Sequence, residues 1–258
     1  MFQPDVPNGN PVSTSPTAVH LTRTCFRVVL IASLTLALLS ALLWLERDFD
    51  RTLLLAHNPL RDLPAIPALS GALSRFGMSA ICALVLACVA ASYRSQSFLQ
   101  ARPALLVVLF SFSASTLAAT ILKQLLGRAR PIVELAGQLN TAVRHDSPSF
   151  PSGHAAQSLA LALPFVLLVP STSLAVRLLK LAMILVASLV GYSRIVKGAH
   201  YPSDVLAGAA LALLCLPLAI AAANALYAHQ RISTAKLEIL VKRQTLVLLA
   251  LMLYLPFL

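Results

Sequence analysis

Long apolar runs separated by short polar segments make up most of the chain, and none of these runs alternates between apolar and polar positions as a half-buried strand does. Six runs have 17 to 23 residues each and cover 25–45, 76–93, 104–126, 154–170, 178–196 and 205–227. The long connection over 46–75 carries three prolines and is expected to be a loop. A helix of about 20 apolar residues crosses the roughly 30 Å hydrocarbon core of a bilayer. The pattern therefore predicts an all-α, polytopic membrane protein built on a bundle of six transmembrane helices.

The two ends of the chain depart from this pattern. Residues 1–22 are polar and carry four prolines, which predicts a disordered tail and not a signal peptide. The membrane domain is expected over 23–229, followed at 230–258 by a basic linker and a short apolar helix. That helix, over 244–258, would span only about 22 Å. We therefore favour an interfacial or packed helix over a seventh crossing.

Composition supports a membrane protein and excludes a soluble one. Hydrophobic residues make up 58% of the chain and charged residues 11%, with a mean hydropathy of +0.82. Soluble domains have about 25% charged residues. The 20 Lys and Arg against 9 Asp and Glu give a net charge of +11, but the basic residues lie mostly between apolar runs. Membrane lipids are therefore the expected partners, and nucleic acid is not.

Basic residues also predict the orientation in the membrane. With six crossings, ten Lys and Arg fall on each side, but three on the side opposite the N-terminus belong to the motifs described next, and seven of the nine acids lie there too. Cytoplasmic loops carry the excess of Lys and Arg. The N-terminal side is therefore expected to be cytoplasmic, and the motif side is expected to face the periplasm or exterior of a bacterial inner membrane.

The first motif closes the third apolar run, where Lys123 is followed after six residues by Arg130 and Pro131. Seven residues are close to two helical turns, so both cations are expected on one helix face, which Pro131 ends. Lys and Arg that snorkel from a helix end would give the same pattern. Arg128 and Arg144, outside the motif, are expected to widen the positive mouth or to contact lipid phosphates.

The second motif is Pro151-Ser152-Gly153-His154, directly before the fourth run. Ser152 is a suitable N-cap, and Gly153 lets a ligand approach the backbone. Free N–H groups at a helix N-terminus bind anions. An ordinary capped helix with an incidental histidine is the alternative interpretation.

The third motif joins the fifth and sixth runs and consists of Ser193-Arg194, then His200 after five residues, then Asp204 after three. Pro202 suits the first turn of the sixth helix, which places Asp204 just inside it. From there Asp204 can reach back to His200 and fix its tautomer. A capping aspartate with a loop histidine would look the same.

Together the motifs favour phosphoryl transfer. Lys123, Arg130 and Arg194 supply three positive charges for a phosphate, and Ser152 and the Gly153 amide add hydrogen bonds. The two motif histidines can then serve as a nucleophile, His200 held by Asp204, and as a proton donor, His154. Few acids lie near these residues, so neither a metal site nor any other cofactor is expected.

These residues match, position by position, the three-part signature of the type 2 phosphatidic acid phosphatase superfamily, which the chain resembles over roughly residues 30–227. The resemblance, which extends to bacterial phosphatidylglycerophosphate and undecaprenyl pyrophosphate phosphatases, implies metal-independent hydrolysis through a phosphohistidine. It implies that His200 is the nucleophile, His154 the acid and Asp204 the partner of the nucleophile. The implied phosphate ligands are Lys123, Arg130, Ser152, Gly153 and Arg194.

Several alternatives remain open at this point. Water and a lipid hydroxyl compete for the same phosphohistidine, so a lipid phosphotransferase, for example one acting on lipid A, is the second hypothesis. A lipid transporter is a third, but it predicts charges near the bilayer midplane, and here they cluster at one boundary. The candidate substrates are an isoprenyl pyrophosphate, phosphatidylglycerol phosphate, phosphatidic acid and a lipid A phosphate.

Overall fold

The computed structural model describes residues 18–139, 147–230 and 234–257, and all regular structure within them is helical. The α-helices are α1 (Arg23–Leu45), α2 (Arg47–His57), α3 (Ile66–Ala91), α4 (Ala101–Leu126), α5 (Pro131–Glu134), α6 (Gly153–Leu168), α7 (Leu174–Val196), α8 (Pro202–Gln230) and α9 (Thr234–Tyr254). Three 3-10 turns accompany them: η1 (Asn58–Asp62), η2 (Gln96–Phe98) and η3 (Leu255–Phe257). The predicted all-α class is confirmed.

Five of the described helices, α1, α3, α4, α7 and α8, are long and apolar enough to cross a membrane. The fourth predicted span is α6, which is apolar but has only 16 residues. A helix of that length rises about 24 Å, which is less than the thickness of the hydrocarbon core. The polytopic architecture is therefore confirmed, whereas a sixth full crossing is not.

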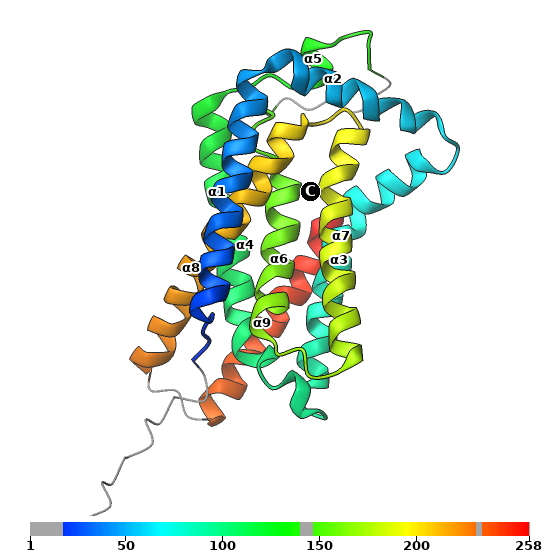
Figure 1. Cartoon of the computed structure of the whole chain (residues 1–258). Coiled ribbons are helices and arrows are strands. Elements are labelled where there is room, and N and C mark those ends of the chain that lie inside the picture. Colours follow the sequence, from blue (N-terminus) through cyan, green and yellow to red (C-terminus); the bar gives the residue numbers. More distant parts are fainter. Residues whose placement is uncertain (1–17, 140–146, 231–233, 258) are drawn as a thin grey trace, which may run out of the picture.

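The bundle is organised around α6, which packs against α4, α7 and α8 (Figure 1). Outside this centre, α1 packs on α8, and α3 packs on α7 and α9. Residues of α6 such as Leu161 and Phe165 are buried, whereas Leu34 and Leu38 of α1 are 59% and 61% exposed. Apolar side chains on the outer surface suit contact with lipid, so the central helix is covered by protein and the outer helices by the bilayer.

Residues 18–22 of the predicted tail and 234–243 of the predicted linker belong to the ordered structure, whereas residues 1–17 of that tail lie outside the described residues. Val19, placed in the predicted tail, is buried, and its N–H and carbonyl pair with the side-chain amide of Asn224 at 3.0 and 2.8 Å. At the other end, α9 begins at Thr234, ten residues before the expected helix, and packs against α3 and α4. Residues 18–22 therefore belong to the folded domain, because their backbone is hydrogen-bonded to α8.

The connection over 46–75, expected to be a loop because of its prolines, is mostly helical. Pro59 and Pro67 occupy the first positions of η1 and α3, where a missing N–H costs nothing. The second span consequently starts at Ile66 and not near residue 76. Figure 1 shows α2 lying across one end of the bundle, over the N-terminal end of α8.

The expectation that Lys123 and Arg130 share one helix face is wrong. Gly127 ends α4 with the left-handed φ of 57°, a conformation that suits glycine. Arg130 has extended backbone and is the N-cap of α5, whose first residue is Pro131. The chain therefore turns between the two cations, and the proline that was expected to stop a helix begins one.

Gly208 lets the second and third motifs meet. A Cβ atom there would lie 2.5 Å from the Ser152 carbonyl oxygen and 3.1 Å from the Ala156 nitrogen. We expect Gly208→Ala to force α6 away from α8, because backbone cannot yield as a flexible side chain would. Overpacking of this kind costs about 1–3 kcal/mol. The purified variant should melt at a lower temperature and lose at least about tenfold in kcat/KM.

Gly71→Ala is the matched control, because Gly71 also lies in a long helix but has open space where a Cβ would stand. Alanine is favoured over glycine within a helix by roughly 0.5–1 kcal/mol. Gly71→Ala should therefore leave activity unchanged and the melting temperature equal or higher. If Gly208→Ala and Gly71→Ala had the same activity and melting temperature, the close approach of α6 and α8 at Gly208 would not be needed for function.

Candidate active site

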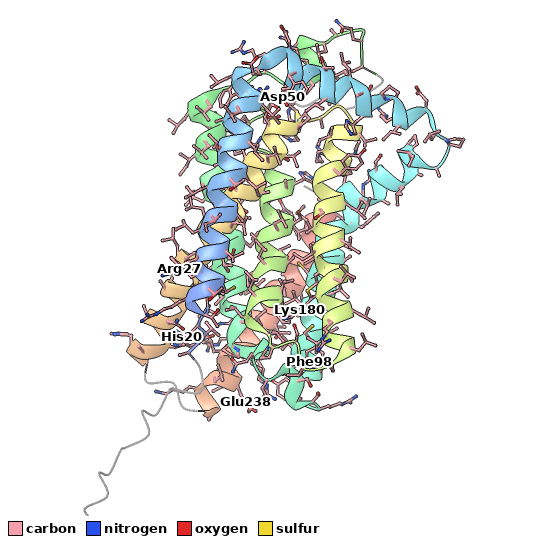
Figure 2. All side chains as sticks on the ribbon, viewed as in Figure 1. His20, Arg27, Asp50, Phe98, Lys180 and Glu238 are labelled. Carbon is pink, nitrogen blue, oxygen red and sulfur yellow. The ribbon has the colours of Figure 1, made fainter. Side chains whose placement is uncertain are left out.

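All three motifs lie at one end of the bundle, at the C-terminal ends of α4 and α7 and the N-terminal ends of α6 and α8. Figure 2 marks this end with Asp50, whereas His20, Phe98, Lys180 and Glu238 lie at the opposite end. Alternating helix directions explain the convergence, because every second connection returns to the same end. The predicted clustering of the motifs on one side is therefore confirmed.

At the centre of the site, His200 is buried and faces Asp204, with 3.3 Å between Nδ1 and Oδ2. The same oxygen accepts hydrogen bonds from the Tyr201 N–H, at 2.9 Å, and from the Ser149 hydroxyl. A carboxylate accepts only, so this contact assigns the proton of a neutral imidazole to Nδ1. The lone pair of Nε2 is then available on the other side of the ring.

Arg130 lies on that other side, with Nη1 3.4 Å from Nε2 of His200. Its guanidinium is held by the Ala199 carbonyl at 3.0 Å and by the carbonyl and hydroxyl of Ser147 at 2.7 and 2.9 Å. Arginine is a donor only, so the contact with His200 agrees with an unprotonated Nε2. The backbone carbonyls of Ser147 and Ala199, which are distant from Arg130 in sequence, therefore hold the Arg130 guanidinium next to the His200 ring.

The other two motif cations also lie near His200, because their charges act on its ring. Lys123 Nζ donates to the carbonyls of Pro148 and Ser149 at 2.7 and 3.2 Å, and Arg194 donates to the Ser74 hydroxyl. Burial, followed by the positive charges of Arg194, Arg130 and Lys123, lowers the pKa of His200 well below its ordinary value of 6.5. The nucleophile candidate is therefore neutral at pH 7, because a proton would be added among three cations.

The second motif meets the third through the backbone, since the Ser152 N–H donates to the Asp204 carbonyl at 2.8 Å. Ser152 is the N-cap of α6 as predicted, but its hydroxyl does not cap the helix. Its Oγ is buried without a hydrogen-bond partner among the described residues, and beside Gly153 there is open space. A hydroxyl so placed can donate to a ligand oxygen. His154 follows, half-buried in the first turn of α6.

Arg128 is the residue whose place the sequence did not predict. It does not widen the mouth of the site: its side chain is 8% exposed and bridges Asp50 and Asp204, at 2.8 and 2.7 Å. Asp50 comes from α2, in the segment expected to be a loop. The sequence held no signal for this pairing, because Arg128 is not one of the residues that define the first motif. Arg144 lies outside the described residues.

Among the described residues, no group of three or more His, Cys, Asp and Glu side chains is placed to hold a metal ion. Of the two histidines at the site, His200 is committed to Asp204 on one side and to Arg130 on the other. The arrangement instead offers three cations, one neutral imidazole and one unpartnered hydroxyl. Chemically, it can hold a tetrahedral anion and present Nε2 to it.

Fold and site together define a helical membrane protein with a positively charged, histidine-centred site. Residues 104–228 match the model of the PAP2 superfamily, and this segment contains all three motifs. The resemblance to the PAP2 superfamily that the motifs predicted is confirmed over this segment, which is just under half of the chain.

Two relatives give this assignment detail. Over 105 residues the chain is 39% identical to a lipid A 1-phosphatase of Rhizobium johnstonii, a match that covers 39% of this chain and 40% of that protein. The crystal structure of a transmembrane PAP2-type phosphatidylglycerolphosphate phosphatase from Bacillus subtilis superimposes with a TM-score of 0.57. It is 23% identical and covers 80% of this chain and 98% of its own. That likeness establishes the fold.

Proposed function

We propose that the protein is a membrane lipid phosphatase that hydrolyses a phosphomonoester or pyrophosphate of a lipid without a metal. The observation that carries this proposal is the buried His200–Asp204 pair, whose free Nε2 faces Arg130 at 3.4 Å. A similar lipid A 1-phosphatase and the fold of a phosphatidylglycerolphosphate phosphatase support a lipid substrate. Hydrolysis is proposed over transfer to a lipid acceptor, because both relatives are named as phosphatases.

The proposed reaction has two steps at one phosphorus atom. In the first, Nε2 of His200 bonds to phosphorus, the ester P–O bond breaks, and His154 gives its proton to the departing oxygen. In the second, His154 takes a proton from water, whose oxygen displaces His200 and releases inorganic phosphate. Lys123, Arg130 and Arg194 with Ser152 and the Gly153 amide are the proposed ligands of the phosphoryl oxygens.

The deciding experiment is phosphate release from a panel of lipid phosphates by detergent-purified protein, with and without excess EDTA. The panel contains an isoprenyl pyrophosphate, phosphatidylglycerol phosphate, phosphatidic acid and a lipid A phosphate. Inorganic phosphate should appear equally in both conditions. A strict need for magnesium would reject the metal-free reaction, and phosphate recovered only on a lipid acceptor would indicate a phosphotransferase.

A lipid tail is expected to raise kcat/KM by orders of magnitude. The site lies where four helices end, so an amphiphile can present its headgroup while its tail stays in the bilayer, and this binding positions the phosphate against His200. The measurement is kcat/KM for alkyl phosphates of increasing chain length. Equal efficiency on p-nitrophenyl phosphate and the longest ester would remove the argument for a lipid substrate.

We further propose that the site faces the periplasm or exterior of a bacterial inner membrane, on the strength of the charge distribution. In a background without the four cysteines, Asp62→Cys and Glu238→Cys place single thiols at exposed positions on opposite ends of the bundle. A membrane-impermeant maleimide should label the first in intact spheroplasts and the second only after permeabilisation. The reverse labelling would invert the proposed orientation.

A further inference from the structure

A buried ionic bridge lies behind the catalytic aspartate. Arg128 Nη1 donates to Asp204 Oδ1 at 2.7 Å, and Nη2 donates to Asp50 Oδ2 at 2.8 Å. The three side chains are 8%, 0% and 0% exposed in the order Arg128, Asp50, Asp204. Buried charges persist only where opposite charges and hydrogen bonds compensate them. Here one guanidinium compensates two carboxylates.

Asp50 also holds the first turn of α8. It accepts the Ser203 N–H at 3.1 Å on Oδ1 and the Ser203 hydroxyl on Oδ2. From α1, the Ser40 hydroxyl donates to the Ser203 carbonyl at 2.9 Å. A carboxylate is stabilised at a helix N-terminus by the free N–H groups and the helix dipole. The N-terminal helices thus fix the residue that directly precedes Asp204.

Arg128 is fixed in its turn by an aromatic ring. Its guanidinium carbon lies 4.1 Å from the centre of the Tyr201 ring. The Tyr201 hydroxyl donates to Glu134 Oε2 at 2.8 Å, and Arg51 of α2 donates to the same oxygen at 3.1 Å. A planar guanidinium that stacks and bonds to two carboxylates cannot be replaced by a lysine ammonium without loss.

We propose that Arg128 is a positioning residue that keeps Asp204 ionised and aligned with His200, and that Asp50 contributes by holding Arg128 and the start of α8. The inference rests on the proposed function, because it takes His200 as the nucleophile. Without the guanidinium, two carboxylates would share one buried site, and like charges favour protonation of one of them. A protonated Asp204 could not stabilise the positive charge that His200 gains when Nε2 bonds to phosphorus.

The charged groups around Asp204 allow the proposed role of Arg128 to be tested by the pH dependence of kcat/KM. Its carboxylate is contacted by Arg128 and His200, and the nearest other acid is Asp50, reached through Arg128 and Ser203. Arg130 contacts the opposite edge of the His200 ring at Nε2, and the charges of Lys123 and Arg194 also act on that ring. Among these cations, Arg128 is the one that donates to the Asp204 carboxylate in the described site, so its loss changes the charge next to Asp204 most directly.

Arg128→Met should lower kcat/KM at pH 7 by about a hundredfold, less than the roughly 10⁴-fold cost of disabling the aspartate of a catalytic triad. The acid limb of the pH profile should move to higher pH, so that the loss shrinks in alkaline buffer. Arg128→Lys keeps the positive charge but not the two-sided guanidinium geometry, so it should show a smaller shift and a smaller loss, and it serves if the methionine variant does not fold. Arg47→Met, an exposed arginine of α2 at the same end, is the control and should match the wild type.

Adding Asp50→Asn to Arg128→Met distinguishes charge from folding. Asparagine still accepts the Ser203 N–H but removes the carboxylate that opposes Asp204, so the double variant should regain at least about tenfold in kcat/KM. A purely structural role predicts that the two losses add. A loss equal at every pH and unrelieved by Asp50→Asn would overturn the inference. The proposed function itself fails separately, if His200→Ala retains turnover.

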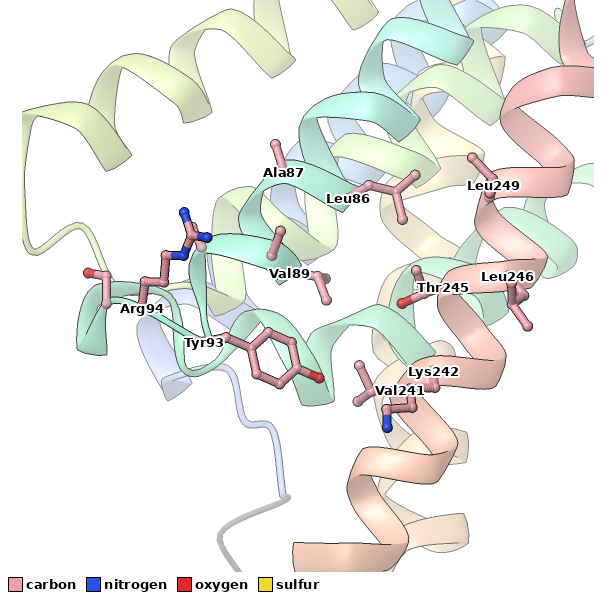
Figure 3. Close-up of a pocket in the computed structure, with 13 residues that line it drawn as sticks. Leu86, Ala87, Val89, Tyr93, Arg94, Val241, Lys242, Thr245, Leu246 and Leu249 are labelled. Atoms are coloured by element: carbon pink, nitrogen blue, oxygen red, sulfur yellow. The ribbon is translucent and has the colours of Figure 1, made fainter.

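A second, independent feature lies at the other end of the molecule. A groove of about 1100 Å³ runs between the C-terminal end of α3 and α9. Figure 3 shows Leu86 of α3 and Leu249 of α9 on the two helices that form its walls. Tyr93, Arg94 and Lys242 also line it, and both cations are exposed, so a mostly apolar groove carries two positive charges.

We infer that this groove binds one anionic phospholipid of the leaflet opposite the active site, with an acyl chain between α3 and α9. Charge complementarity selects this occupant, because basic pockets between membrane helices bind anionic headgroups. Arg102 packs on the ring of Tyr93, a lining residue, with its guanidinium carbon 4.0 Å from the ring centre. The apolar walls favour binding of the acyl chain, and the cations favour binding of the anionic headgroup.

The test is thermal unfolding of delipidated protein in neutral detergent, titrated with dioleoylphosphatidylglycerol or dioleoylphosphatidylcholine. Inorganic phosphate is kept in excess to occupy the active site. The anionic lipid should raise the melting temperature of the wild type and of Arg243→Gln, a neighbouring cation outside the groove. Each cation near a headgroup strengthens binding roughly fivefold, so the double variant Arg94→Gln/Lys242→Gln should bind about 25-fold more weakly. Equal responses to both lipids, or from the double variant and the control, would overturn the inference.

Discussion

His200→Ala is expected to abolish phosphate release, lowering kcat by at least about 10⁴-fold, because no other group in the described site can take the place of Nε2. Removal of a nucleophile in other hydrolases has effects of this size or larger. The protein should still fold, because Asp204 and Arg130, the side chains that contact the ring, each keep several other hydrogen bonds. Initial rates and gel filtration of the detergent-purified variant measure the two expectations.

His229→Ala is the matched control, since His229 is exposed at the opposite end of α8. It should leave both rate and fold unchanged. With ³²P-labelled substrate, an acid-labile protein-bound phosphoryl group should form in the wild type and be absent from His200→Ala. Turnover in His200→Ala close to that of the control would refute a phosphohistidine at this position.

The pH profile of the wild type should reflect the same residue. Burial and three neighbouring cations lower the pKa of His200 well below 6.5, so its neutral, nucleophilic form predominates at pH 7. Activity is lost as the pH falls through this lowered pKa, because protonation removes the lone pair of Nε2. The acid limb of kcat/KM should therefore be centred below pH 6.5. A limb centred above that value would contradict the assignment.

His154→Ala is expected to lower kcat/KM for an alkyl phosphate by about 10²–10⁴-fold, the usual contribution of a general acid. The physical reason is the leaving group: an alkoxide is a strong base and needs a proton as the P–O bond breaks. The variant should lose far less with p-nitrophenyl phosphate, because p-nitrophenolate leaves without protonation. The measurement is the ratio of the two losses.

A second readout separates a proton donor from a phosphate ligand at the same position. In the proposed second step His154 accepts a proton from water, so His154→Ala should accumulate labelled phosphohistidine from p-nitrophenyl phosphate. A phosphate ligand alone predicts equal losses for both esters and no accumulation. That result would leave His154 without the proposed role.

Features that depend on residue type and local spacing were predictable from the sequence. Long apolar runs specify membrane helices, because a bilayer offers no partner for free backbone groups. The placement of Pro202 and Asp204 in the first turn of α8, with Asp204 reaching His200, followed from four residues of local geometry. The meeting of the motifs at one end followed from alternating helix directions.

What tertiary structure decided depends on contacts between distant segments. Prolines suggested a loop over 46–75, yet packing over α8 makes most of it helical, and Pro59 and Pro67 are the second residues of η1 and α3. A similar error placed Arg130 on α4, although Gly127 turns the chain before it.

The bridge from Asp50 through Arg128 to Asp204 could not be predicted from the sequence either, because it also joins distant segments. Asp50 and Ser203 are 153 positions apart, and neither residue lies in a pattern that identifies the other. Local sequence fixes which charges the chain carries and on which side of the membrane they emerge. Which of them are buried together depends on how α2 packs on α8, because only packing removes water and forces opposite charges to pair.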